Sequence, residues 1–281
     1  MYWYGLSGDV STDPADAAAR LRAAKTDMSG YVPCDWCEAE RLGLVKDRQE
    51  YLAAVRRAAI YLAEEGIAAV AQEKDAELLQ MVRTLDEMDT VINLLSERLI
   101  EWYISVTPSF SRKYLGSGAG ASRMVPMIGK KGTDLMKNIA REILSMSNAR
   151  TGLMKAVSRK AVSVIPNMSV LTGGLVAARL VSRAGGLAAA ARMPGSSMQV
   201  LGAEGALFSH IRAGTPAPKH GIVFQHRRVH NAPREVRGQV ARVLASKLAI
   251  AARLDYFRGE LDAEFAATAN AKIDSLLEVG R

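Results

Sequence analysis

The sequence predicts a mainly α-helical protein with a small N-terminal region, an antiparallel coiled-coil hairpin and a compact all-helical domain. Three observations support this fold class. Helix-favouring residues such as alanine, leucine, arginine, lysine and glutamate are abundant. One long apolar stripe repeats with helical spacing, and prolines and glycines interrupt the chain where helices would begin and end. About half of the residues are hydrophobic (49%), which is enough for a core.

The N-terminal region, residues 1–77, is expected to contain two helices. The first begins at Asp13-Pro14 and runs through Ala24, and Gly30 and Pro33 interrupt the chain after it. The second covers residues from about 47 to 71. The aromatic residues Tyr2 to Tyr4 suggest a short strand. Residues 1–77 are therefore expected to form a reduced N-terminal domain.

The region 78–165 is predicted to be a helical hairpin that dimerises. Its first helix carries apolar residues spaced by alternating fours and threes, typical of a coiled coil. These residues are Met88, Ile92, Leu95, Leu99, Trp102 and Val106. Pro108 ends this helix, and the glycine run 116–120 forms the turn, since no GxxxxGK[ST] phosphate loop is present. Thr133 caps the return helix, which ends at Ile165-Pro166. Such arms often pair with a copy of themselves.

Residues 166–260 are predicted to form the compact domain, followed by a C-terminal tail over 261–281. The expected elements, in chain order, are a helix over 171–184, a helix capped by Ser196 and Ser197, a helix from Gly202 to Gly214, and a long helix from Pro233 to about Tyr256. A proline- and glycine-containing loop joins the last two.

Targeting and membrane segments are not expected. The first ten residues lack the basic and apolar regions of a secretory signal. The most apolar region, residues 161–193, is interrupted by a proline and by three arginines, which argues against a membrane span. We therefore expect a cytoplasmic protein without a membrane partner.

The two cysteines lie close together, at Cys34 and Cys37, with the spacing of a redox pair or of half a zinc site. A closed zinc site needs four ligands, but no second pair exists and the histidines are far away in sequence. A structural or incidental role is favoured over redox or metal chemistry. We expect no metal and no cofactor.

The net charge of +8 conceals an uneven distribution along the chain. Residues 1–110 carry a net charge of −8, whereas residues 111–260 carry +18. So much positive charge would repel itself without a partner, although solvated helix faces are the plainer interpretation. The distribution suggests an acidic end that meets protein and a basic remainder that binds nucleic acid.

The stretch from Val200 to Arg253 resembles the Nop domain. The similarity lies in several separated motifs that occur in the order of that family: VLGAE at 200–204, ALF at 206–208, TP at 215–216, PKHG at 218–221, RG at 237–238, AR at 241–242 and KLAIAAR at 247–253. INLLSER at 92–98 and EWY at 101–103 resemble the start of the family's coiled coil. The chain is therefore similar to the archaeal fibrillarin partners of box C/D ribonucleoproteins.

This resemblance implies a scaffold and not an enzyme. In the family, the Nop domain recognises a kink-turn RNA together with a small kink-turn-binding protein. The coiled coil dimerises, and the N-terminal domain holds the fibrillarin methyltransferase. The complex directs guide-RNA-dependent ribose 2′-O-methylation, so no catalytic residue is expected in this chain.

The residues themselves agree with RNA binding. Backbone amides at 202–204 open a helix, whose positive end can accept a phosphate. Basic side chains supply charge and two glutamines supply neutral donors and acceptors, so phosphate contacts would dominate affinity and RNA shape would be recognised. The candidate RNA-binding residues are Gln199, Gly202, Ala203, Glu204, Lys219, His220, Arg234, Arg237, Gln239 and Arg242. Further charge comes from His226, Arg227 and Arg228. Gly205 and Gln239 stand where the family usually has lysine.

Lys247 is predicted to be a buried lysine paired with Glu204. On a helical wheel of the long helix, Lys247 falls near the middle of the apolar face, where an unmatched charge is costly. Glu235 and Asp255 lie on the same helix, too distant in sequence for a contact, which leaves Glu204. Alternatively, Lys247 extends to the surface and buries only its stem.

Two other functions are compatible with the sequence. One is a helical dimerisation module that binds any nucleic acid loosely through its basic surface. Affinity for a kink-turn alone, with no gain from the kink-turn-binding protein, would favour it. The other is a redox or metal protein that uses its two cysteines. No carboxylate pair or nucleophile–base pair supports other chemistry.

Overall fold

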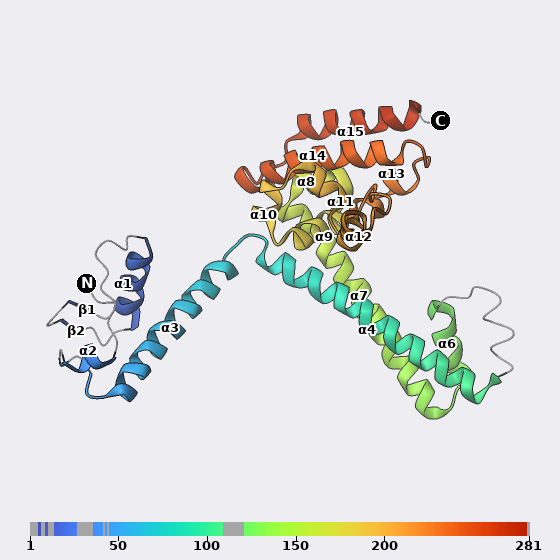
Figure 1. The fold of residues 1–281 in the computed structure, drawn as a ribbon. Coiled ribbons are helices and arrows are strands. Elements are labelled where there is room, and N and C mark those ends of the chain that lie inside the picture. The colour runs from blue at the N-terminus through green and yellow to red at the C-terminus, as the bar shows by residue number, and fades with distance from the viewer. Residues whose placement is uncertain are drawn as a thin grey trace. The chain divides into compact units, whose positions relative to one another are not determined.

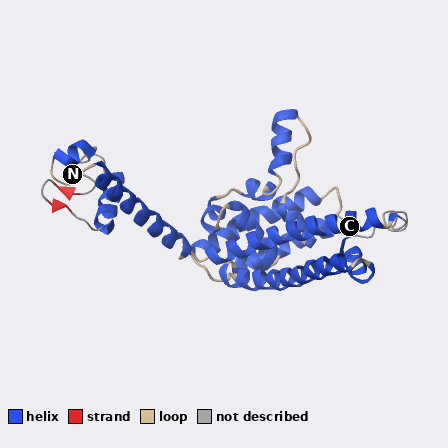
Figure 2. Cartoon of the chain, turned by 90° about the horizontal axis from the view of Figure 1, so that it is seen from below, coloured by secondary structure: helices blue, strands red, loops and turns tan. Residues whose placement is uncertain are grey.

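The computed structural model describes residues 5–6, 9–10, 14–26, 36–41, 43, 45–108 and 121–279. The protein is mainly α-helical, as the sequence predicts, and divides into two units, residues 1–73 and 74–281 (Figure 1). In the described part of the chain, strands occur only in the N-terminal unit (Figure 2). No helix among the described residues is both long and apolar enough to cross a membrane.

The N-terminal unit is a small helical layer. Its elements are β1 (Gly5–Leu6), β2 (Asp9–Val10), α1 (Pro14–Thr26), α2 (Trp36–Arg41) and α3 (Arg48–Ala71). The two strands pair antiparallel, and α1 and α2 both pack on α3. Among the described residues of this unit, the buried hydrophobic side chains are alanines: Ala17, Ala18, Ala39 and Ala58. The strand expected at residues 2–4 lies outside the described residues, and so does Cys34.

The second unit begins with the hairpin. It consists of α4 (Ala76–Val106), the short α6 (Ala121–Lys131) and α7 (Asp134–Val164), and α4 and α7 run side by side away from the body (Figure 1). Thr133 caps α7 as predicted, because its hydroxyl accepts the Met136 N–H at 3.5 Å. The glycine run 116–120 lies outside the described residues. The helix α6 packs against α4 and α7, and Ile128, Met136 and Ile143 form an apolar core there.

The contact surface of α4 inside the hairpin is not the predicted stripe. Residues spaced by alternating fours and threes face inward, but this series starts at Leu78. It comprises Leu78, Val82, Leu85, Asp89, Ile92, Ser96, Leu99 and Tyr103. Asp89 belongs to this series because its carboxylate binds the guanidinium of Arg150 on α7 (2.7 and 3.1 Å).

The predicted stripe divides between the inside and the outside of the hairpin. Ile92 and Leu99 pack within it, and Met88 is half-buried. The side chains of Leu95, Trp102 and Val106 are 37%, 39% and 59% exposed and lie on the outer side. The prediction that all six residues pack as one stripe was wrong. An apolar repeat of 3.5 residues does not determine which of two adjacent faces of a helix packs against its neighbour.

The compact body follows the hairpin. Its elements are α8 (Pro166–Thr172), α9 (Gly174–Ala184), α10 (Leu187–Arg192), α11 (Gly195–Val200), α12 (Glu204–Ala213), the 3₁₀ helix η3 (Ile222–Gln225), α13 (Arg227–His230), α14 (Arg237–Phe257) and α15 (Ala263–Val279). The central helix is α14, which α8, α10, α11 and α15 all contact (Figure 1). Buried alanines and leucines along α14 allow this close packing.

Several boundaries in this body differ from the sequence prediction, and the long helix expected from Pro233 begins only at Arg237, after a turn. The helix expected over 171–184 is broken at Gly173, where a φ of +78° separates α8 from α9. The helix α11 begins at Gly195 after Pro194, so the two serines lie inside it and do not cap it. The expected C-terminal tail forms α15, which packs on α8 and α14 with Ile273 fully buried.

A buried polar network holds α8 against the end of α14. The carboxylate of Asp255 accepts the backbone N–H of Asn167 (2.8 Å), its side-chain amide (2.8 Å) and the N–H of Met168 (2.9 Å). The Asn167 amide also binds the loop before α15, at the Glu260 carbonyl (2.7 Å) and the Asp262 N–H (2.8 Å). Asp255 and Asn167 together thus link α8, α14 and the loop before α15.

Candidate nucleic-acid interface

Two separated segments of the body are joined by main-chain hydrogen bonds. The Gly221 N–H donates to the Gln199 carbonyl (2.9 Å), and the Ile222 N–H donates to the Leu201 carbonyl (2.8 Å). The Gln199 side chain closes the pair by donating to the Lys219 carbonyl (2.7 Å). A Cβ on Gly221 would lie 2.0 Å from the Leu201 carbonyl oxygen, so only glycine permits this approach. Two predicted site residues, Gln199 and Lys219, are therefore held side by side.

Beside this junction lies a stack of aromatic and cationic groups. The ring of His220 stacks on Phe224 with centroids 4.4 Å apart and planes inclined by 13°. The ring of His230 lies 5.0 Å from Phe224 on a tilted plane, and the Arg237 guanidinium lies 5.5 Å from the same ring. Arg237 also donates to the carbonyls of His230 (3.2 Å) and Ala232 (2.9 Å). The predicted residues His220 and Arg237 are thus brought together by Phe224.

Phe224 and His230 were missed by the sequence analysis as members of the site. Phe224 lies between two histidines, His220 and His226, in the HGIVFQH stretch, and this was the available signal. It was insufficient, because a lone aromatic residue near a helix end is more often part of the core.

Two histidines of this surface, His220 and His226, add little positive charge to it at neutral pH. Burial lowers the pKa of His220, and the nearby Arg237 and Lys219 lower it further. Burial, with Arg228 and Arg227 nearby, lowers the pKa of His226 to about 4. The positive charge of this surface therefore resides mainly on its lysines and arginines.

Several cations of residues 219–242, the region that forms this stack, have no acidic partner among the described residues. They are Lys219, Arg227, Arg234 and Arg242, and all four are exposed. The stem of Lys219 lies near Gly238 at the start of α14, since a Cβ there would be 3.7 Å from Lys219 Cδ. Gln239 is also exposed. Arg228 differs, because it binds Asn270 and Asp274 (2.9 Å) and fastens α15 to α13.

The start of α12 is occupied by a carboxylate of the protein itself. Glu204 accepts the Gly202 N–H (2.9 Å) and binds the Arg183 guanidinium through both oxygens (3.1 and 2.9 Å). The hydrogen bonds from Arg183 lower the pKa of Glu204 to about 2, and the Gly202 N–H adds to this. Ala203 is half-buried at the N-cap position. The amide of Gly202, expected to be open to phosphate, already has an acceptor.

The predicted pair of Glu204 and Lys247 is wrong. The partner of Glu204 is Arg183, and Lys247 is half-buried without an acidic partner in the described part of the chain. This burial fits the alternative in which the stem packs and the ammonium reaches water.

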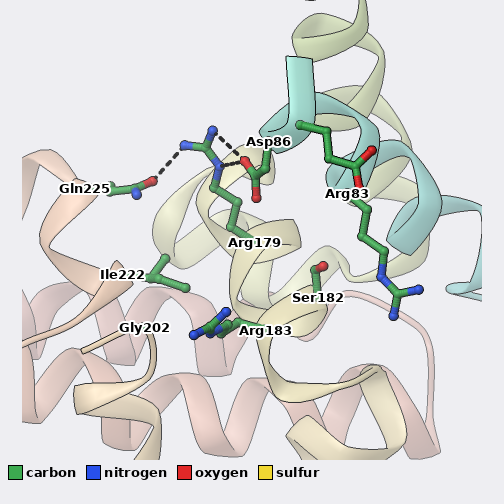
Figure 3. Close-up of a pocket in the computed structure, with 9 residues that line it drawn as sticks. Arg83, Asp86, Arg179, Ser182, Arg183, Gly202, Ile222 and Gln225 are labelled. Atoms are coloured by element: carbon green, nitrogen blue, oxygen red, sulfur yellow. Dashed lines mark hydrogen bonds and ion pairs between the residues drawn. The ribbon is translucent and has the colours of Figure 1, made fainter. Parts of the chain in front are cut away.

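An open pocket of about 650 Å³ lies between this helix start and the base of the hairpin (Figure 3). It is lined by Arg83, Asp86 and Glu87 of α4, Arg179, Ser182 and Arg183 of α9, and Gly202, Ile222 and Gln225. Arg179 bridges the two sides, because it binds Asp86 (3.0 and 3.1 Å) and donates to the Gln225 side chain (3.0 Å) (Figure 3). The pocket thus has charged walls and little apolar lining.

A hairpin arm, an α14-centred body and a cation-rich junction define a mainly helical protein with a surface suited to a polyanion. The family model described as "Nop: snoRNA binding domain, fibrillarin" matches residues 117–278. The chain belongs to this family, as the motifs of residues 200–253 predict.

Relatives and a solved structure agree with this assignment. An uncharacterized NOP5 family protein of Methanocaldococcus jannaschii is 30% identical over 272 residues, covering 84% of this chain and 66% of the relative. Nucleolar protein 58 of Scheffersomyces stipitis is 29% identical over 244 residues, covering 74% and 47%. The chain therefore spans about half to two thirds of the length of these relatives. A chain in the crystal structure of a fibrillarin/Nop5p complex is 25% identical with a TM-score of 0.53, and the match covers 98% of both chains.

Proposed function

We propose that the protein is the scaffold of a box C/D-type ribonucleoprotein and binds a kink-turn RNA jointly with a kink-turn-binding protein. The observation that carries this proposal is the junction of residues 199–201 with 219–222, which places Lys219 and His220 beside Arg237. The family description names snoRNA binding, and the similar solved chain comes from a complex with fibrillarin. In this role the chain positions RNA and partners and performs no chemistry itself.

RNA binding by this surface would rest on phosphate contacts and on shape. Lys219, Arg234 and Arg242 are exposed and have no acidic partner among the described residues, so they can bind phosphates without first breaking an ion pair. The stack of His220 on Phe224 offers an aromatic edge next to them, where unstacked bases or ribose can pack. Since the pKa values of His220 and His226 are lowered, these two side chains should contribute little to any change of affinity between about pH 6.5 and pH 8.

A salt titration tests this surface directly. Lys219→Gln and Arg242→Gln should each weaken kink-turn RNA binding and lower the slope of log affinity against log salt by about one unit. Lys272→Gln, an exposed lysine of α15, removes the same charge away from the junction and should leave the slope unchanged. Equal slopes for all three variants and the wild type would refute the proposed interface. A gain in affinity from the kink-turn-binding protein separates specific assembly from loose nucleic-acid binding.

We propose that the outer face of the hairpin mediates dimerisation. Exposed apolar side chains gather on α4, where a lone surface helix would carry polar ones. They are Val91, Leu94, Leu95, Trp102 and Val106. Trp102→Asp should convert a dimer to a monomer in light scattering without lowering the melting temperature. Met88, Ile92 and Leu99 pack more within the hairpin and contribute less to this face.

We propose that the N-terminal unit binds a fibrillarin-type methyltransferase. Support comes from the solved fibrillarin/Nop5p complex, whose match to this chain is long enough to include the N-terminal unit. Co-purification of the full chain with fibrillarin, and its loss when residues 1–73 are deleted, would test this partner. The cytoplasmic location expected from the sequence stays a prediction.

A further inference from the structure

The pocket beside α12 carries three arginines that the proposed RNA surface does not use, and two acids, Asp86 and Glu87, also line it. Arg83, Arg179 and Arg183 all line it, together with the Ser182 hydroxyl and Gly202 (Figure 3). Arg83 and Arg183 are drawn on either side of Ser182 in that view. The 3₁₀ helix η3 contributes to both surfaces, because Ile222 and Gln225 line the pocket and Phe224 stacks on His220. An RNA that reaches one surface can therefore reach the other.

The arginines of this pocket differ in their exposure and in the number of side chains that they bind. The Arg179 side chain is only 18% exposed and binds Asp86, Asp89 and Gln225, so its role is to hold the walls of the pocket together. The side chain of Arg183 is 57% exposed and has a single acidic partner, Glu204, itself 50% exposed. Arg83 is exposed and has no ion pair with any residue that the structure describes. The guanidinium groups of Arg83 and Arg183 can therefore bind a ligand with little loss of folding stability, because exposed ion pairs stabilise a fold very little.

The carboxylate of Glu204 has the surroundings that a phosphate would have. Two parallel N–H groups of Arg183 point at its two oxygens, and the Gly202 N–H donates to one of them. The two non-bridging oxygens of a phosphodiester match the same fork of donors. Glu204 is anionic at every pH above its low pKa of about 2, so it carries the charge of the group it resembles.

We propose that this pocket is a second binding site for a backbone phosphate of the RNA, and that Glu204 occupies it in the RNA-free protein. The phosphodiester displaces Glu204 from Arg183 and binds Arg183 and Arg83. This inference rests on the proposed RNA-binding function. Its consequence is that Glu204, although it lies within the RNA-binding region, opposes RNA binding.

The test compares two glutamate-to-glutamine variants with the full chain and a kink-turn RNA as the probe. Glu204→Gln removes the competing charge but keeps an amide oxygen for the Gly202 N–H, so affinity should rise about two- to fivefold, the range expected for loss of an exposed ion pair. Glu264→Gln, on α15 and outside the pocket, makes the same charge change and should alter affinity less. In an Arg183→Gln background the gain from Glu204→Gln should vanish.

Three results would overturn the inference. The first is a Glu204→Gln variant that binds no more tightly than Glu264→Gln. The second is an equal gain with and without Arg183, which would indicate a general effect of charge. The third is an Arg83→Gln variant with unchanged affinity; this variant does not depend on how Glu204→Gln folds. Failure of the wild type to bind the RNA at all would instead refute the proposed function.

Discussion

Substitution of Asp255 tests the network that fixes α8, α14 and the loop before α15. Its side chain is fully buried, and its carboxylate accepts three N–H groups from Asn167 and Met168 at 2.8–2.9 Å. Asp255→Ala leaves those donors without their protein acceptor at a position that is fully buried in the wild type. Asp255→Asn keeps the shape and one oxygen.

The size of the loss follows from the donors left unpaired. Each unsatisfied buried donor costs about 1–3 kcal/mol, and the two backbone donors belong to the first turn of α8, where water can partly replace the carboxylate. We therefore expect Asp255→Ala to lower the free energy of unfolding by about 3–5 kcal/mol, and Asp255→Asn by about 1–2 kcal/mol. For a unit of this size, about 2–4 °C is lost per kcal/mol, so thermal denaturation followed by circular dichroism resolves both changes.

The pH dependence of the same variants gives a sharper check. Burial raises the pKa of Asp255 above its ordinary value of 3.8, and the hydrogen bonds from Met168 and Asn167 offset only part of this rise. The native state then holds this proton more tightly than the unfolded state, so the stability that Asp255 contributes is fully present below pH 3.8 and is lost as pH rises through the raised pKa. The advantage of wild type over Asp255→Asn should therefore shrink from pH 4 upward. An advantage that grows with pH would show that the hydrogen bonds outweigh desolvation.

Three further variants test separate parts of the structure. Leu99→Ala, at a position only 2% exposed, should cost about 2–5 kcal/mol in denaturant unfolding, whereas Leu95→Ala on the outer face should cost under about 1 kcal/mol. Gly221→Ala should cost at least about 2 kcal/mol and abolish RNA binding, while Gly205→Ala, whose Cβ meets nothing within 4 Å, should be neutral or slightly stabilising; equal melting temperatures would contradict the close approach to Leu201. Arg228→Ala should speed amide hydrogen exchange throughout α15, and unchanged exchange would show that its bonds to Asn270 and Asp274 are dispensable.

Helix identity was largely predictable from the sequence, but the hairpin seam was not. Helix ends follow from local chemistry, as at Thr133, whose hydroxyl caps α7. The seam of α4 includes Asp89 and Ser96, which a search for apolar residues passes over. Only the position of Arg150 on the neighbouring helix makes an aspartate favourable there, and that position depends on how two helices 61 residues apart align.

The sequence predicted which residues belong to the site, but it did not predict which of these side chains bind one another. The family motifs and the charge distribution identified Lys219, His220 and Arg237, which the structure brings to one surface. The partner of Glu204 was assigned by counting the acids available to Lys247. That count assumed that the lysine needed a partner, and it ignored that Arg183 could reach Glu204 from α9. Pairings between helices depend on packing angles, which a single sequence does not contain.

The ion network around Arg179 links the hairpin to the proposed RNA surface. Asp89 of α4 binds Arg150 of α7 on one side and Arg179 of α9 on the other (3.4 Å), and Arg179 donates to Gln225, the neighbour of Phe224. A partly buried network of this kind is strongly directional, because each guanidinium has fixed donor positions. This network therefore fixes the position of the aromatic stack relative to the base of the hairpin. If the hairpin dimerises, the distance between the two RNA surfaces of the dimer is set by the ion network around Arg179 and by the length of the hairpin.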